Sequence, residues 1–351
     1  MLFNVPVLPD ADLVQYLNDH AESLYSCYFS LHAPHIHDGR LQRQFLDTAR
    51  WVDLLGHLNI ARKYLLMNSR AHAHSAYFET DALKRVVSSL ASMIDAGAVQ
   101  GIVFNDAYYL QAISDAGPDV AAQLQAVPSI NHMLDSFDRI ASLMEFIAST
   151  RFALPGTVIL DRSLNRRMDA LAEVSTRCRE QYPGIKIELL ANEGCLSHCP
   201  FKLTHDCHIS LVNMGQVLDT HVVNRQLGCL RTLQRNPAQL FKSPFIRPED
   251  IGAYEPFVDV LKICGRTLGA PFLMRAMDAY LKGSFSGNLI ELLDAMEPVT
   301  QWLHVANESL PNDFLRQLSR CSRDCRSCRT CEDLLRTCAR PKQINLKRSW
   351  R

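Results

Sequence analysis

Residues 100–106, QGIVFND, decide the fold class, because they set a pattern that recurs through the chain. A short apolar run is followed directly by polar side chains, and the pattern returns at 63–68 (KYLLMN), 157–162 (TVILDR) and 185–193 (IKIELLANE). Between these runs lie longer segments of helical period. Such alternation is typical of βα units that build a parallel sheet.

Eight runs fit a strand: residues 2–7, 23–28, 63–68, 100–104, 126–130, 157–160, 185–190 and 258–263. An amphipathic stretch such as 134–147, with apolar side chains at i, i+3 and i+4, predicts a helix between two of them. Eight strands with intervening helices predict an α/β fold, a TIM-like (β/α)8 barrel with a cysteine-rich C-terminal extension. We expect the barrel at 1–285, with a cysteine-bearing insertion at about 195–256, and a helical, basic extension at 286–351.

The composition is that of an ordinary globular protein, which excludes a disordered or fibrous one: 351 residues, 47% hydrophobic, with 37 basic and 37 acidic side chains. Without net charge, a nucleic acid or anionic lipid would need a local basic patch. The N-terminus lacks the features of a secretory signal, and no stretch approaches the about 20 apolar residues of a membrane span. We expect a cytoplasmic protein.

The 12 cysteines are clustered, and in a reducing compartment they favour metal binding over disulfides. A first set comprises Cys195, Cys199, Cys207 and Cys229. Soft thiolate ligands select zinc, copper(I) or iron–sulfur clusters. In a zinc site, nearby histidines could add nitrogen ligands: His198, His205 and His208. Cys178 and Cys264 fit apolar packing, Cys27 is a weaker candidate for the first set, and Cys338 is unassigned.

A second set lies in the tail, where Cys321, Cys325, Cys328 and Cys331 follow the spacing C-x3-C-x2-C-x2-C. Four thiolates so spaced can chelate one zinc ion or one 4Fe-4S cluster. The surroundings are basic: Arg316, Arg320, Arg323, Arg326, Arg329, Arg336, Arg340, Lys342, Lys347, Arg348 and Arg351. This patch is either a solvated surface around a cysteine knuckle or a nucleic-acid-binding surface.

Polar residues follow several predicted strands, at the end of a barrel where active sites form: Asn68, Asn105, Asp106, Asn131, His132, Asp161, Arg162, Asn192 and Glu193. Further candidate catalytic residues are Arg247, Glu249, Asp250, Lys262 and Arg266. Arginine forks bind carboxylate or phosphate, so Arg247 and Arg266 could hold an anionic substrate. The alternative is a salt-bridged staple between Arg247 and Glu249 or Asp250.

Several phrases together resemble the peptidase family U-32, the collagenase-like group: NEGCLSHCPFKLTHDCHISL from 192, SPFIRPEDIGAYEPFVDVLKICGRT from 243, GNLIELL from 287 and CSRDCRSCRTC from 321. KYLLMNS, GIVFND, VPSINHMLDSFDR and VILDRSLN occur in family order, after HDGR near Arg40. The similarity is strongest to a branch found largely in anaerobic metabolism. It implies a (β/α)8-like barrel.

The family's peptidase name is a weak guide, because neither a Gly-x-Ser-x-Gly elbow nor an HExxH motif occurs. Cys207 and His208 are adjacent in sequence, which does not give the geometry of a cysteine protease. The resemblance also extends to iron–sulfur, oxygen-independent hydroxylases of ubiquinone precursors or RNA, which implies a 4Fe-4S cluster on Cys195, Cys199 and Cys229, with Cys207 as the fourth ligand. It further implies prephenate as an oxygen donor, although the cysteine spacing departs from that of the hydroxylases.

Three readings follow. The first is an iron–sulfur enzyme with one or two 4Fe-4S clusters, performing a redox or oxygen-independent hydroxylation step on a small molecule or RNA, with a partner subunit or electron donor. The second is a zinc-stabilised RNA-binding protein, with zinc at the C-terminal site. The third is a U-32-type peptidase.

Overall fold

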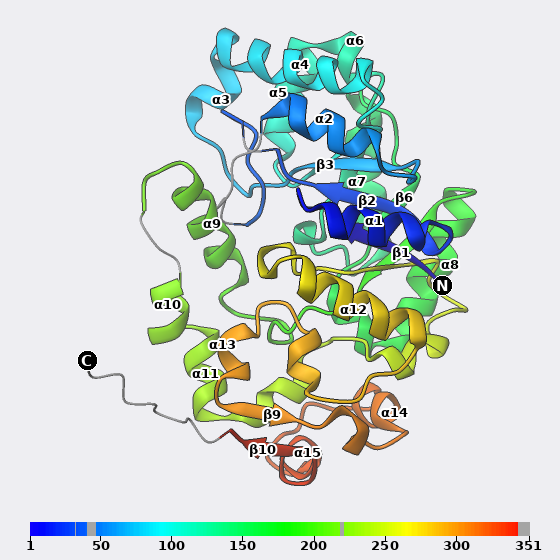
Figure 1. The fold of residues 1–351 in the computed structure, drawn as a ribbon, viewed down its shortest axis with the longest axis vertical. Coiled ribbons are helices and arrows are strands. Elements are labelled where there is room, and N and C mark those ends of the chain that lie inside the picture. Colours follow the sequence, from blue (N-terminus) through cyan, green and yellow to red (C-terminus); the bar gives the residue numbers. More distant parts are fainter. Residues whose placement is uncertain (32, 41–46, 218–220, 343–351) are drawn as a thin grey trace.

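The computed structural model describes residues 1–31, 33–40, 47–217 and 221–342 (Figure 1). Its centre is an eight-stranded sheet in the order β5-β4-β3-β2-β1-β8-β7-β6, in which every paired neighbour is parallel. The gap between the two outer strands, β5 and β6, is narrowed by an isolated parallel bridge between Gln125 of β5 and Ala153, which precedes β6. The sheet is therefore a nearly closed barrel, and the predicted TIM-like α/β fold is confirmed.

All of the predicted strands are present, most of them a residue or two shorter than expected. Their bounds are β1 (Leu2–Pro6), β2 (Leu24–Phe29), β3 (Lys63–Met67), β4 (Gly101–Phe104), β5 (Gln125–Pro128), β6 (Thr157–Ile159), β7 (Lys186–Leu190) and β8 (Val260–Lys262). The apolar runs are buried on both faces because helices cover the outside of a parallel barrel while side chains fill its interior.

Successive side chains of a strand point to opposite faces of the sheet. Tyr28 belongs to a separate interior cluster with Tyr64 and Val103 from neighbouring strands. Cys27, the preceding residue, instead packs in the large core between the strands and the helices. It is fully buried there, so the prediction that Cys27 reaches the mouth of the barrel is wrong.

Helices follow the strands around the outside of the barrel. They include α2 (Thr48–Gly56), α3 (His74–Phe78), α4 (Thr80–Asp95), α5 (Ala107–Ala116), α7 (Phe137–Ser149) and α8 (Met168–Gln181). The helix predicted at 134–147 is α7; Ser136 precedes its first turn, and Ile140, Met144 and Ile147 form its buried stripe. None of the described helices has both the length and the apolarity that crossing a membrane requires.

The insertion after β7 folds into α9 (Lys202–Asn213), α10 (His221–Gln226), α11 (Cys229–Arg235), a short helical turn η4 (Pro237–Lys242) and another, η5 (Pro248–Ala253). Beyond the barrel come α13 (Glu297–Thr300), α14 (Phe314–Ser319), α15 (Thr330–Cys338) and two antiparallel strands, β9 (Leu303–Val305) and β10 (Ala339–Pro341). The extension was predicted to be helical, and the structure differs in that it also contains this two-stranded sheet. Pairing β10 with β9 returns the chain to the body of the extension.

Insertion and extension share one hydrophobic cluster, separate from the barrel core, in which Leu233, Leu240 and Phe241 pack with Phe314 and Leu334. Figure 1 shows the extension, coloured orange to red, beside α11 and at the opposite end of the molecule from α4. The domain boundary at 285/286 stays a prediction. Lys347, Arg348 and Arg351 of the predicted basic tail lie outside the described residues.

Candidate active site and cysteine centres

The polar residues after the strands meet at one end of the barrel. Asn68, after β3, donates a hydrogen bond to Ser129 after β5 over 3.1 Å and accepts one from the backbone amide of Gly39 over 2.9 Å. Asn192, after β7, donates to the carbonyl oxygen of Cys264 after β8 over 3.0 Å. These contacts connect strands far apart in the chain, so the predicted residues do line one mouth.

Buried ion pairs cross this mouth. Arg40 lies 3.3 Å from a carboxylate oxygen of Glu193 and 3.0 Å from one of Asp294, and Glu193 also pairs with Arg162. Asp294 belongs to the segment that follows the barrel. The charges thus join the strand ends to the start of the extension.

A second group of charges surrounds Asp206, which is buried on α9. Arg70 lies 3.5 Å from the Asp206 carboxylate, and Lys202 contacts the same carboxylate from one turn earlier. Burial lowers the pKa of Lys202 to about 8, against the opposing attraction of Asp206. Two cations share one carboxylate, which leaves a local excess of positive charge at this side of the mouth.

His72 and Asp106 form a buried pair at the ends of β3 and β4. Nδ1 of His72 lies 3.0 Å from a carboxylate oxygen of Asp106, and the hydroxyl of Tyr77 donates to that oxygen over 2.6 Å. These hydrogen bonds lower the pKa of Asp106 against the opposing effect of burial. Nε2 of His72 has no hydrogen-bond partner among the described residues, so the pair lacks an adjacent nucleophile.

Two further groups beside this pair are buried without partners in the described part of the chain. Both amide atoms of Asn105 and Nε2 of His132 make no hydrogen bond there. Burial, together with the smaller effect of the positive charge of Arg70, lowers the pKa of His132 to about 4. A neutral imidazole and a free amide are groups that hydrogen-bond a polar ligand.

The first cysteine set lies at the border between this mouth and the insertion. The Cys199 thiol is close enough to those of Cys195 and Cys229 to raise the pKa of both, although burial is the larger cause in each case. Arg162, Arg40 and Lys202 act in the opposite direction on the pKa of Cys195. Cys207 lies partly buried on α9. The structure therefore brings Cys195, Cys199 and Cys229 into one neighbourhood.

A polar cavity of about 210 Å³ opens beside this set. Its wall includes Cys199 and His198 from the insertion, Lys202 from α9, and Arg162 and Ser163 from the end of β6. The wall also carries the carboxylates of Asp135 and Asp161, so charges of both signs stand beside the thiol in a space large enough for a small polar molecule.

The tail cysteines lie around a second cavity of about 220 Å³, whose wall contains Cys321, Cys325, Cys328 and Cys331. Cys321, Cys325 and Cys328 are exposed. Burial raises the pKa of Cys331 to about 11, and the other three thiols add to the shift. The predicted second set is therefore brought together around one space.

The donor chemistry of both sets suits a metal–thiolate centre, since soft thiolates are grouped around a common neighbourhood or cavity. Across the described residues, no three or more histidine, cysteine, aspartate or glutamate side chains are arranged as a preformed site for a single ion. The tail thiols lie around one cavity, and four thiolates are a donor set for either one zinc ion or one 4Fe-4S cluster.

Three predicted catalytic residues lie between the barrel and the extension. Arg247 donates to both carboxylate oxygens of Asp250, over 3.0 and 3.1 Å, and its guanidinium stacks on Phe314. Glu249 accepts hydrogen bonds from the backbone amide of Phe285, over 2.7 Å, and from Asn307, over 2.8 Å. This is the geometry of the alternative prediction, a staple. A role of the three in catalysis stays a prediction.

The other two predicted residues lie nearer the barrel axis. Lys262 is buried, with Nζ 3.6 Å from Glu188 and 3.6 Å from the ring centroid of Tyr28, and burial lowers its pKa. Arg266 forms an ion pair of 3.0 Å with Asp38. Cys264 is buried as predicted, but its thiol lies 3.2 Å from the amide oxygen of Asn192, so its surroundings are polar rather than apolar.

Sequence reasoning missed much of the mouth: Asp38, Arg70, His72, Lys202, Asp206 and Asp294. The sequence did contain a signal for the pair of Lys202 and Asp206. Lys202 and Asp206 are four residues apart on a segment of helical period, and opposite charges at that spacing meet on one helix face. His72 and Asp106 come from different strand ends, and only the barrel register brings them together.

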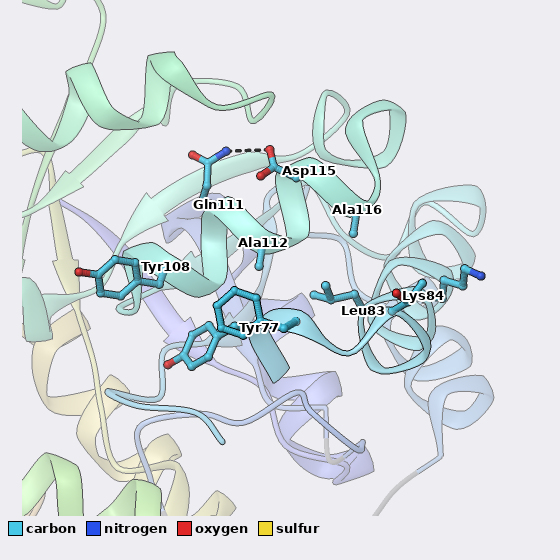
Figure 2. A pocket seen from close by; sticks show the side chains of 10 residues that line it. Tyr77, Leu83, Lys84, Tyr108, Gln111, Ala112, Asp115 and Ala116 are labelled. Carbon is cyan, nitrogen blue, oxygen red and sulfur yellow. Dashed lines mark hydrogen bonds between the residues drawn. The ribbon is translucent and has the colours of Figure 1, made fainter. Parts of the chain in front are cut away.

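A separate apolar groove of about 740 Å³ lies on the outer side of the mouth, between α3, α4 and α5. Figure 2 shows Tyr77 and Tyr108 at one end of it and Lys84 and Ala116 at the other. Tyr108 and Phe78 are strongly exposed, at 83% and 72%. Tyr77 contacts both the groove and the mouth, because it lines the groove and its hydroxyl donates a hydrogen bond to Asp106.

Comparison with known proteins relates part of the chain to a named protein. No protein-family model matches. A solved structure of a U32 peptidase aligns over 76% of this chain and 93% of its own, with a TM-score of 0.47 and 13% identity. An uncharacterized protease of Methanocaldococcus jannaschii is 34% identical over 155 residues, which is 44% of this chain and 44% of the archaeal protein. Over that stretch the chain is homologous to the archaeal protein.

Proposed function

We propose that this chain is an iron–sulfur enzyme of the peptidase U-32 family, which performs a redox or oxygen-independent hydroxylation step in the cytoplasm. Its substrate is a small molecule or RNA bound at the barrel mouth. The carrying observation is that the Cys199 thiol lines the mouth cavity and lies near Cys195 and Cys229. Partial homology to the archaeal protein and the resemblance of the cysteine-bearing phrases support the family assignment.

In this proposal Cys195, Cys199 and Cys229, with Cys207 as fourth ligand, hold a 4Fe-4S cluster, and the tail cysteines hold a second. Such a cluster supplies one-electron chemistry next to the substrate. Burial raises the pKa of Cys195, and the charges of Arg162, Arg40 and Lys202 offset part of that rise toward the thiolate, the form that binds metal. Lys202 and Arg162 also place hydrogen-bond donors on the cavity wall, beside the carboxylates of Asp135 and Asp161, where they would contact a polar group of the substrate.

Buried polar groups lie beside the strand ends. His72 is fully buried, with Nε2 unpartnered among the described residues and Nδ1 held by Asp106, which orients the ring. A polar substrate group that reached Nε2 would find a hydrogen-bonding partner there. Asn105 and His132 add hydrogen-bonding groups beside it.

The test is anaerobic purification of the full chain, followed by counting of iron and acid-labile sulfide and by an absorbance spectrum. We expect a broad band near about 400 nm from thiolate-to-iron charge transfer and about eight iron atoms per chain for two clusters. Zinc without iron would contradict the proposal and favour the zinc-stabilised alternative.

A peptidase is the second candidate, favoured by the homology to an archaeal protein named as a protease. The free Nε2 of His72 counts against a nucleophile–histidine pair at that position. Hydrolysis of labelled gelatin by the purified chain would support a peptidase if it survived Cys195→Ala with Cys199→Ala and stopped on changing another nucleophile. We expect no hydrolysis.

A further inference from the structure

The tail cysteines are surrounded by positive charge. Residues 313–342 carry eight arginine or lysine side chains against four carboxylates. Arg316, Arg329 and Arg336 each pair with a carboxylate three residues away. Arg320, Arg323 and Arg326 are exposed around the thiols, and we call these three the arginine rim. An exposed metal-binding site inside a basic rim attracts an anionic macromolecule.

The composition of the tail bears on which anionic macromolecule fits. Proteins that bind single-stranded RNA stack bases on aromatic side chains. Among residues 313–342 the single aromatic side chain is Phe314, which is fully buried against Phe245 and Phe241. The described part of the tail, up to Lys342, therefore offers charge without an exposed stacking surface, which favours an acidic protein over RNA at this part.

The tail also touches the loop that carries the mouth cysteines. The Arg323 guanidinium donates to the hydroxyl of Ser197, between Cys195 and Cys199, over 3.4 Å. Cys331 packs against the same hydrophobic cluster as Cys199 and Cys229. The two cysteine sets are thus neighbours through one loop contact and one shared core.

We propose that the tail is the electron-entry port of the molecule, where an acidic one-electron carrier protein of the ferredoxin class docks on the arginine rim. The tail cysteines would hold the centre that takes one electron from the carrier, and the mouth cysteines the centre to which that electron is delivered. The carrier would end oxidised by one electron and the mouth centre reduced by one. No bond is made or broken and no proton moves. This inference rests on the proposed iron–sulfur function and names its partner.

The experiment uses the anaerobically purified full chain and a reduced acidic bacterial ferredoxin as the probe. Binding is measured by biolayer interferometry at low and high salt. The test variant is Arg320→Glu with Arg326→Glu, both exposed and outside the thiol ligands. The matched control, Arg50→Glu with Arg151→Glu, changes the net charge equally at exposed positions on the barrel.

We expect the dissociation constant to rise at least tenfold in the tail variant, a loss of about 1.4 kcal/mol, and to stay at the wild-type value in the control. Salt should weaken wild-type binding because the contact is electrostatic. Reduction by the ferredoxin, followed as bleaching of the cluster absorbance, should slow in the tail variant, while reduction by dithionite, a small molecule, should not.

Equal ferredoxin binding by both variants would overturn the inference. So would binding of a single-stranded RNA 20-mer that is lost in the tail variant while the ferredoxin does not bind at all. In these outcomes an unchanged iron content leaves the proposed function intact. A protein without iron overturns both, so the two failures are distinguishable.

Discussion

The two cysteine sets lie in opposite physical settings. The mouth set lies at the end of the barrel, near ion pairs to buried carboxylates such as those of Arg40 with Glu193 and Asp294. The tail set lies on an exposed loop, where Cys321, Cys325 and Cys328 face solvent. An unpaired charge buried near the mouth set would destabilise the fold. Surface charge near the tail set costs little stability and is free to bind a partner protein.

The largest expected loss of stability comes from removing a buried ion pair inside the barrel. Glu188→Ala would leave the Lys262 ammonium buried without the carboxylate that lies 3.6 Å away. We expect a loss of about 3–5 kcal/mol in the free energy of unfolding, because an uncompensated charge remains inside. Urea titration measures it. A midpoint equal to that of the wild type would mean that the barrel interior is open to water.

A smaller loss tests the seam between the mouth and the extension. A Cβ atom at Gly194, next to Cys195, would lie 2.1 Å from Cγ of Met296. We expect Gly194→Ala to cost about 1–3 kcal/mol through overpacking. Gly252→Ala is the matched control, since a Cβ there meets no atom within 4 Å. Similar urea midpoints for the two variants would contradict this packing of the cysteine loop.

The pH dependence of stability provides a third test of the mouth. Burial lowers the pKa of His132 to about 4 from an ordinary 6.5. Between these values the unfolded chain binds a proton that the native state resists, so stability present above pH 6.5 is lost as the pH falls toward 4. The loss approaches about 1.4 kcal/mol per pH unit within that window.

We therefore expect His132→Gln to lose less stability than the wild type between pH 7 and pH 5, as measured by urea midpoints. His57→Gln, at an exposed histidine of the surface, is the control and should follow the wild type. If all three proteins lost stability in parallel, His132 would be accessible to protons in the native state.

The smallest effect is expected in the tail. Arg336→Ala removes an exposed ion pair with Asp333, of 2.9 Å. Solvent screens such pairs, so the free energy of unfolding should change by less than about 0.5 kcal/mol. A change as large as that of Glu188→Ala would mean that the tail surface is as tightly coupled to folding as the barrel interior.

The barrel was predictable from the sequence, because each strand is a short apolar run that ends in polar residues, as in QGIVFND at β4. The grouping of the tail cysteines was predictable for a similar local reason, since their spacing spans only 11 residues from Cys321 to Cys331. Local patterns carry local structure.

Contacts between distant segments were not predictable in the same way. Arg40, Glu193 and Asp294 belong to three segments that only the closed barrel joins. The face of Cys27 depends on the register of β2, and one residue of difference moves a side chain from the interior to the helix layer. The sequence left open whether Arg247 binds a substrate or pairs with Glu249 or Asp250. Only the folded structure shows that Arg247 pairs with Asp250.

Both cysteine sets are proposed to hold iron–sulfur clusters, and iron counting in paired variants tests this proposal without relying on a substrate. The variants are Cys195→Ser with Cys199→Ser at the mouth and Cys325→Ser with Cys328→Ser in the tail, each purified anaerobically beside the wild type. We predict that each pair removes about half of the iron and sulfide of a two-cluster protein. Unchanged iron in the mouth variant, or zinc in place of iron in the wild type, would contradict the account.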